Sequence, residues 1–208
     1  MNNEIQDKKW DYQIKIILLG SCGTGKTNFI SKICRNQFDI ESHSTIGIEF
    51  GIRDVIVESH LFRLQLWDTA GQEKFLSMTS GYFKNAAGVF LLYDITKKDS
   101  FDQIQVWLKM CKQYLDQNCV LYLVGNKTDL QYLREVNRSS GQSFAQVNQL
   151  LFEECSAASG EKIEDILKEM ISNIYQILMM NEIQVDNPQS KSSLSIKSNQ
   201  NTLNSCCI

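Results

Sequence analysis

The residues with the clearest chemistry form the segment Gly20 to Thr27, which matches the pattern G-x-x-x-x-G-K-[ST]. A triphosphate needs backbone N–H groups that converge on its oxygens, and glycines let a loop curl closely enough to supply them. Lys26 would neutralise phosphate charge, and the Thr27 hydroxyl would bind Mg²⁺. A solvated glycine turn is the alternative, but the segment lies between an apolar strand and a helix start, as the motif requires. The pattern therefore predicts phosphate binding by Ser21, Cys22, Gly23, Thr24, Gly25, Lys26 and Thr27.

A second candidate metal ligand, Asp68, follows the alternating apolar run 61–67, in the sequence Trp-Asp-Thr-Ala-Gly-Gln-Glu. A carboxylate at a strand end near the phosphate loop can hold Mg²⁺, directly or through water. Alone, these residues would be an ordinary turn, but downstream of the loop they predict a second metal-binding element. Thr45, in a polar stretch between the first helix and the next strand, could reach Mg²⁺ and the γ-phosphate from a movable loop. The predicted metal ligands are therefore Thr27, Thr45 and Asp68.

The third motif, Asn126-Lys127-Thr128-Asp129, comes at the end of an apolar run. An aspartate carboxylate can accept hydrogen bonds from the N1–H and 2-amino groups of guanine. Adenine has neither donor, so it would leave a buried Asp129 unpaired, at ~1–3 kcal/mol or more. On its own the motif would be a solvated turn, but after the other two it predicts guanine rather than adenine. Two weaker candidates join it: segment 154–157 could place backbone N–H groups near the guanine O6, and Phe38 could stack on the base or belong to the core.

The elements that must position these motifs alternate between strands and helices. Apolar runs and alternating apolar residues predict strands at 14–19, 50–57, 61–67, 88–94, 120–126 and 150–154. Helical spacing of apolar residues, or in one case a polar run, predicts helices at 27–35, 101–115, 139–149 and 163–178. The short connection 58–60 predicts an antiparallel hairpin. Together these elements predict an α/β fold, in which helices cover both faces of a mainly parallel sheet with one antiparallel edge.

Composition bounds the protein class and the domain plan. The 208 residues include 43% apolar and 22% charged side chains and carry a net charge of −3, without the basic excess that nucleic-acid binding favours. The sequence has no apolar run near the ~20 residues of a membrane span. Seven cysteines and a polar amino terminus without a secretory signal predict reduced thiols in the cytosol. Three parts are predicted: an extension at 1–10, one domain at 11–180, and a disordered tail rich in Ser, Asn and Gln at 181–208.

These motifs, in this order and at these intervals, resemble the Ras superfamily of small GTPases. Finer details resemble the Rab family: Ile46-Gly47-Ile48-Glu49-Phe50, the run LQLWDTAGQE from Leu64 to Glu73, Lys74-Phe75, Tyr82-Phe83-Lys84-Asn85-Ala86 and Leu92-Tyr93-Asp94-Ile95-Thr96. The likeness spans about residues 10–180, and the terminal Cys206-Cys207-Ile208 is similar to Rab carboxyl termini that carry two geranylgeranyl groups. The resemblance implies the P-loop small-GTPase fold, a mainly parallel six-stranded sheet flanked by five helices.

The resemblance also implies roles for single residues. Thr45 would lie in switch I and Gly71 in switch II, both in contact with the γ-phosphate. Gln72 would orient the attacking water, while Lys26 stabilises charge during catalysis. Phe38 would be the aromatic residue beside the guanine. The guanine loops would contain Asn126, Lys127 and Asp129 in one case, and Ser156, Ala157 and Ala158 in the other; the lipidation sites would be Cys206 and Cys207.

The implied function is a membrane-anchored switch in vesicle-mediated protein transport, which binds GTP or GDP with Mg²⁺ and hydrolyses GTP slowly. The implied partners are a guanine nucleotide exchange factor, a GTPase-activating protein, a GDP dissociation inhibitor, a Rab escort protein and effector proteins, but no nucleic acid. The implied form is a monomer on the cytoplasmic face of intracellular membranes that cycles through the cytosol.

Two departures from the Rab pattern affect the site. The family's Ser-Ala-Lys is Ser156-Ala157-Ala158 here, so a lysine that packs on the base is missing. Its loss predicts looser nucleotide binding with unchanged specificity. Cys22 stands where Ras proteins have glycine and Rab proteins often have serine. A side chain there crowds the γ-phosphate and predicts slow intrinsic hydrolysis.

Two other functional classes stay open at this point. In a P-loop ATPase or kinase, Asp129 would be accidental. A nucleotide-locked scaffold would bind without turnover, but the retained Thr45, Asp68 and Gln72 argue against it.

Overall fold

A six-stranded sheet runs through the protein in the strand order β2-β3-β1-β4-β5-β6. The computed structural model describes residues 10–39, 48–69 and 80–185. The strands are β1 (Tyr12–Leu19), β2 (Ile48–Val57), β3 (His60–Thr69), β4 (Ala86–Asp94), β5 (Val120–Asn126) and β6 (Leu151–Glu154). The helices in this part of the chain are α1 (Lys26–Arg35), α2 (Ser80–Phe83), α3 (Lys98–Asp102), α4 (Ile104–Tyr114), α5 (Arg138–Asn148) and α6 (Ile163–Val185), with a 3₁₀ helix, η2 (Thr128–Leu133). The predicted α/β fold is confirmed.

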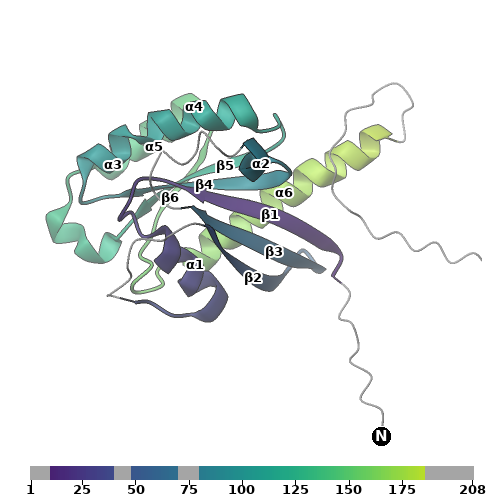
Figure 1. Cartoon of the computed structure of the whole chain (residues 1–208), viewed down its shortest axis with the longest axis horizontal. Coiled ribbons are helices and arrows are strands. Elements are labelled where there is room, and N and C mark those ends of the chain that lie inside the picture. Colours follow the sequence, from purple (N-terminus) through teal and green to yellow (C-terminus); the bar gives the residue numbers. More distant parts are fainter. Residues whose placement is uncertain (1–9, 40–47, 70–79, 186–208) are drawn as a thin grey trace, which may run out of the picture.

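The sheet is parallel except at one edge, where β2 pairs antiparallel with β3. Helices α1 and α6 lie on one face of the sheet, and α3, α4 and α5 lie on the other (Figure 1). Because β1, β3, β4, β5 and β6 run in the same direction, their carboxyl ends share one edge of the sheet. Loops that follow these strands can therefore meet there, as in other α/β folds.

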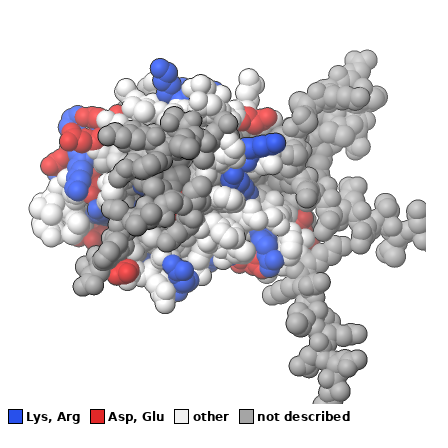
Figure 2. All heavy atoms as spheres, in the orientation of Figure 1, with Lys and Arg blue, Asp and Glu red and all other residues white. Residues whose placement is uncertain are grey.

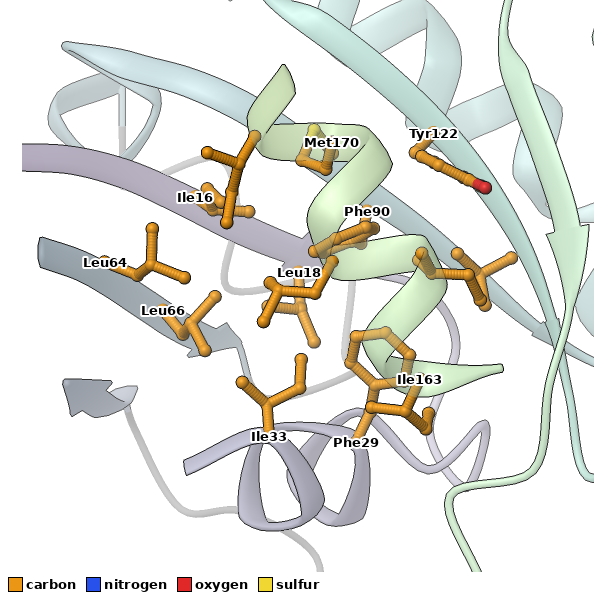
Figure 3. Close-up of a cluster of buried hydrophobic side chains, with 14 of the residues drawn as sticks. Ile16, Leu18, Phe29, Ile33, Leu64, Leu66, Phe90, Tyr122, Ile163 and Met170 are labelled. Atoms are coloured by element: carbon orange, nitrogen blue, oxygen red, sulfur yellow. The ribbon is translucent and has the colours of Figure 1, made fainter. Parts of the chain in front are cut away.

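The core explains why β1 is almost continuously apolar. Ile16 and Leu18 contribute to a buried cluster on the α1–α6 face, whereas Ile17 and Leu19 contribute to a second cluster on the opposite face. All four side chains are fully buried. Figure 3 shows the first cluster, in which side chains of β1 and β3 meet Phe29 and Ile33 of α1 and Ile163 and Met170 of α6. A strand covered on both faces needs apolar residues at successive positions.

The hairpin turn differs from the predicted connection. His60 is already the first residue of β3, so the connection is the pair Glu58-Ser59. Both residues have positive φ angles, 50° and 69°. Two such residues match the right-handed twist of the flanking strands, as in type I′ turns. Neither is the Asn or Gly that usually marks this turn, so the sequence predicted the hairpin from its short connection but not the two-residue turn.

The helices differ from the predictions in number and length. The helix expected at 101–115 is divided into α3 and α4 at Gln103, which itself keeps helical angles (φ −68°, ψ −16°). Counted as one, these two helices give the five that the resemblance implies. Helix α6 continues to Val185, beyond the domain boundary expected at residue 180. In the described residues, no helix is both long enough and apolar enough to cross a membrane. Acidic and basic side chains are interspersed over the described residues visible in Figure 2.

Candidate functional site

The loop between β1 and α1 depends on two glycines. Gly20 has a φ of 149°, and a Cβ atom there would collide with the carbonyl oxygen of Leu92 on β4. Gly25 has a φ of 90°, and a Cβ atom there would lie 2.5 Å from the side-chain nitrogen of Asn126. Both positions combine a backbone conformation that favours glycine with the close approach of a neighbouring strand. The loop is therefore pressed against the ends of β4 and β5.

Lys26, the first residue of α1, folds back across this loop. Its Nζ donates hydrogen bonds to the carbonyl oxygens of Gly20 at 2.8 Å and Ser21 at 3.0 Å. The side chain is buried, and burial lowers the pKa of Lys26 below its ordinary value, while the nearby Asp68 carboxylate opposes that shift. A buried ammonium held by neutral carbonyls is stabilised by an added anion. The arrangement suits a phosphate group at the loop.

Thr27 connects α1 to the end of β3. Its hydroxyl donates a 2.5 Å hydrogen bond to Oδ2 of Asp68, which is 1% exposed. A hydroxyl and a carboxylate are hard oxygen ligands, and Mg²⁺ in nucleotide sites takes one or two such protein ligands with phosphate oxygens and water. The two oxygens that would have to converge on one ion are already adjacent. The residues present therefore fit the predicted magnesium site.

Asn126, at the end of β5, joins the guanine-loop motif to two other loops. Its Nδ2 donates to the carbonyl oxygen of Thr24 at 2.9 Å, and its Oδ1 accepts from the backbone N–H of Ala157 at 3.0 Å. The side chain is 1% exposed. The amide nitrogen and the amide oxygen are thus both hydrogen-bonded within the protein, so Asn126 connects three loops.

Lys127 makes the neighbouring connection. Its Nζ donates to the carbonyl oxygen of Gly23 at 2.7 Å and lies 2.6 Å from Oδ2 of Asp94. Asn126 and Lys127 therefore hold two successive carbonyls of the phosphate loop. Asp94 did not emerge from the sequence as a site residue, although its place at a strand end, like that of Asp68, was the available signal.

Asp129 and Ser156 link the two predicted guanine loops. The Ser156 hydroxyl donates to Oδ1 of Asp129 at 2.5 Å, and the backbone N–H of Ser159 donates to the same hydroxyl at 3.0 Å. Ser156 is fully buried and Asp129 is exposed. The sequence argument took Asp129 as buried, and it is instead accessible beside a fixed serine. Ala157 is buried and Ala158 half-buried.

A second link between these loops was missed by the sequence reasoning. Arg134, after η2, makes a bidentate pair with Glu154 at 2.7 and 2.8 Å, with side chains 13% and 5% exposed. Glu154 ends β6, directly before the 155–158 loop. Neither residue matches a motif, and nothing in the local sequence indicates that they pair.

Phe38 is 41% exposed, which excludes the alternative that it belongs to the core. The backbone of the next residue, Asp39, exchanges two hydrogen bonds with the Asn28 side chain on α1, at 2.9 and 3.1 Å. The structure thus brings the phosphate-loop candidates, Asp68 and the two guanine loops to one edge of the sheet. The remaining candidates, Thr45, Gly71, Gln72, Cys206 and Cys207, lie outside the described residues.

Known proteins match this chain over most of its length. Residues 15–176 match the Ras family. GTP-binding protein ypt3 of Schizosaccharomyces pombe is 39% identical over 203 residues, covering 96% of this chain and 95% of that protein. Ras-related protein RABA2a of Arabidopsis thaliana is 40% identical over 194 residues, covering 93% and 88%. Ras-related protein rab-11.1 of Caenorhabditis elegans is 40% identical over 181 residues, covering 87% and 86%. The chain belongs to the Rab family of small GTPases.

Family membership makes this Rab GTPase a GTP phosphohydrolase. It excludes the ATPase, kinase and scaffold classes that the sequence motifs alone left open. The start of α1 that carries Lys26, and the strand ends that carry Asp68 and Asn126, now belong to a fold whose activity is known.

Proposed function

We propose that this Rab GTPase binds GDP or GTP with Mg²⁺ at the loops described above and works as a membrane-anchored switch in vesicle trafficking. The carrying observation is the pair of hydrogen bonds from Asn126 and Lys127 to the carbonyls of Thr24 and Gly23. They join the loop that would read the base to the loop that would hold the phosphates. A ligand that spans both loops, with a base at one end and phosphates at the other, fits this arrangement.

The chemistry proposed for the site is positioning and electrostatic stabilisation. Backbone N–H groups of residues 21–27 and the Lys26 ammonium hold the phosphates, and Asp129 accepts from guanine while Phe38 lies beside it. Thr27, Thr45 and Asp68 would hold Mg²⁺, which would supply charge neutralisation on the phosphate oxygens. Gln72 orients the attacking water, and Gly71 contacts the γ-phosphate. A GTPase-activating protein that adds an arginine would accelerate hydrolysis by ~10³–10⁵.

The output of the switch is the recruitment of effector proteins when the γ-phosphate orders the segments around Thr45 and Gly71. An exchange factor reloads GTP, and a GDP dissociation inhibitor and an escort protein handle the lipidated GDP form. The protein then acts on the cytoplasmic face of intracellular membranes and cycles through the cytosol as a monomer.

Base selection tests the proposal directly. Asp129→Asn exchanges an acceptor for a donor, so we expect GDP affinity to fall about 10–100-fold, since a hydrogen bond to a charged group contributes ~1.5–3 kcal/mol. Affinity for xanthosine diphosphate should rise, because its 2-oxo group accepts where guanine donates. Both are measured by displacement of a fluorescent nucleotide, with ADP as a competitor that should fail.

Asp116→Asn is the matched control. Its carboxylate accepts the backbone N–H of Asn118 at the amino-terminal side of β5, at the opposite end of that strand. This variant should keep the wild-type preference for GDP. An Asp129→Asn protein that also keeps it would refute the assignment of Asp129 to the base.

A further inference from the structure

Asp94, the last residue of β4, is a buried carboxylate with a fixed orientation. The residue is 0% exposed. Its Oδ1 accepts from the backbone N–H of Thr96 at 2.9 Å and from the Thr96 hydroxyl at 2.7 Å. Its backbone carbonyl also accepts from the N–H of Lys97 at 3.0 Å and from the hydroxyl of Ser100 at 3.2 Å. These contacts leave Oδ2 facing the one cation described next to it, Lys127.

The contact between Asp94 and Lys127 is an ion pair. Nζ of Lys127 lies 2.6 Å from Oδ2 of Asp94, and its approach is not along a hydrogen-bond direction. The Asp94 side chain is 1% exposed and that of Lys127 is 28% exposed. Attraction between the charges is screened less at a buried carboxylate than at the surface. The pair therefore keeps the ammonium beside β4.

The backbone of Lys127 is also unusual. Its φ is 75°, in the left-handed region, which costs a non-glycine residue about 1–2 kcal/mol. The side chain that leaves this backbone spans two attachment points, Asp94 on β4 and the Gly23 carbonyl in the phosphate loop. Without the carboxylate, only the carbonyl and solvent remain to hold the ammonium.

The ion pair lies at the paired ends of β4 and β5, next to the contacts that join the guanine loop to the phosphate loop. Asp94 lies opposite Asn126 in the strand register. Asn126 holds the carbonyl of Thr24, and Lys127 holds that of Gly23, so successive residues of one loop hold successive residues of the other. Asp94 is the charge that keeps the second of these two contacts in place.

We propose that Asp94 is a positioning residue for the bound nucleotide, which acts through Lys127 to hold the guanine loop against the phosphate loop and so slows nucleotide release. The inference rests on the proposed function, because it needs a nucleotide that spans both loops. Asp94 touches neither Asp68 nor Thr27 in the described contacts, so it leaves the chemical step alone. Its effect is on the residence time of the nucleotide.

The test measures dissociation of fluorescent GDP from the full chain by displacement with excess GDP. Asp94→Asn keeps the shape and the acceptor for Thr96 but removes the charge, and it should speed GDP release about tenfold. Single-turnover hydrolysis of preloaded GTP should stay within about twofold of wild type, since the variant keeps every residue proposed to contact the γ-phosphate. Thr96→Val, which removes one bond to Oδ1 without touching Lys127, is the control and should release GDP at the wild-type rate.

A double-mutant cycle shows whether Asp94 acts through Lys127. Lys127→Met should speed GDP release and lower the melting temperature, because it leaves Asp94 buried without its cation. Adding Asp94→Asn to that variant should raise the melting temperature again, with no further change in the release rate. Wild-type release from Asp94→Asn, or an additive effect in the double variant, would overturn the inference. A wild-type chain that binds no GDP would overturn the proposed function as well.

Discussion

At the scale of single residues, the site is organised largely by contacts within the protein. The Asn126 amide and the Lys127 ammonium donate hydrogen bonds to backbone carbonyls, and the Thr27 hydroxyl donates one to a carboxylate. Such contacts fix donors and acceptors before a ligand arrives, which lowers the ordering that binding requires. A side chain that contacts only the ligand has no contact within the protein to fix it before the ligand binds. Ala158 stands where the resemblance to the Rab pattern implies a lysine that would pack on the base.

Restoring that side chain should tighten nucleotide binding. In Ala158→Lys, the lysine can pack on the guanine, and a cation over an aromatic ring at an exposed site contributes ~0.5–1 kcal/mol. We therefore expect GDP to dissociate about 2–5-fold more slowly, with no change in the preference for GDP over xanthosine diphosphate. Ser159→Lys, one residue further along the exposed loop, is the control and should have the wild-type rate. If both lysines slow release equally, general charge attraction and not packing is responsible.

The sequence could predict which residue types form the site because the spacing of the motifs places them directly after predicted strands or at the ends of these strands. Lys26, Thr27 and Asp68 follow from motifs a few residues long. Asp94 and the Arg134–Glu154 pair do not, because their significance depends on partners across the sheet or in another loop. The exposure of Asp129 and Phe38 likewise depends on how loops pack, which no local pattern encodes. The roles of the site residues stay predictions until ligand binding is measured.

At the scale of elements, strands were predicted more closely than helices. The range 120–126 was predicted as it stands in β5, since a strand buried on both faces is marked by its apolar run. The division of the helix at Gln103 and the four-residue α2 are too short to alter a periodic pattern. The Glu58-Ser59 turn joins the paired strands β2 and β3 although its residue types are not those that usually favour such a turn. Element type thus follows from periodicity, while breaks and turns follow from packing.

The junction of α1 and β3 carries a prediction of its own. Helix α1 has Gly25 as its N-cap and no side-chain capping bond, so Thr27 does not cap the helix. Its hydroxyl instead reaches Asp68 on β3. If that hydroxyl binds Mg²⁺, Thr27→Asn should weaken GTP binding about 10–100-fold more than GDP binding, because GTP carries one more phosphate, whose charge the ion would help to neutralise.

Titration of both nucleotides at fixed Mg²⁺ measures the difference, and the variant should also form a long-lived complex with its exchange factor. Ser31→Ala is the control on the same helix: its hydroxyl accepts from Arg35 in the helix itself. Equal losses of GTP and GDP affinity in Thr27→Asn would mean that Thr27 only connects α1 to β3 and does not bind Mg²⁺.

At the scale of the whole molecule, the candidate site lies at one edge of the sheet, and the connection to residues 186–208 lies at the carboxyl end of α6. The candidate loops follow the carboxyl ends of the parallel strands, and α6 crosses the sheet to end at Val185 (Figure 1). Residues 186–208 lie outside the described part and include Cys206 and Cys207. Attachment through these cysteines would leave the switch and the anchor on separate parts of the chain.

That separation leads to a prediction about membrane attachment. Beyond residue 185 the only basic residues are Lys191 and Lys197, so attraction to anionic lipid would contribute little. By the resemblance to Rab proteins, modification of Cys206 and Cys207 would take the Rab-type route through an escort protein. One lipid chain holds a protein marginally, whereas two give stable anchoring. Two adjacent cysteines supply two attachment points.

Replacing both Cys206 and Cys207 by serine should therefore move the protein from the membrane pellet to the cytosolic fraction. GDP affinity should stay within about twofold, because the cysteines are remote in sequence from every proposed nucleotide contact. Each single replacement should give intermediate attachment that is lost on washing, since one chain remains. Ser205→Ala keeps both thiols and should fractionate like wild type. A double variant that stays in the pellet would mean that another part of the chain, or a bound partner, holds the protein at the membrane.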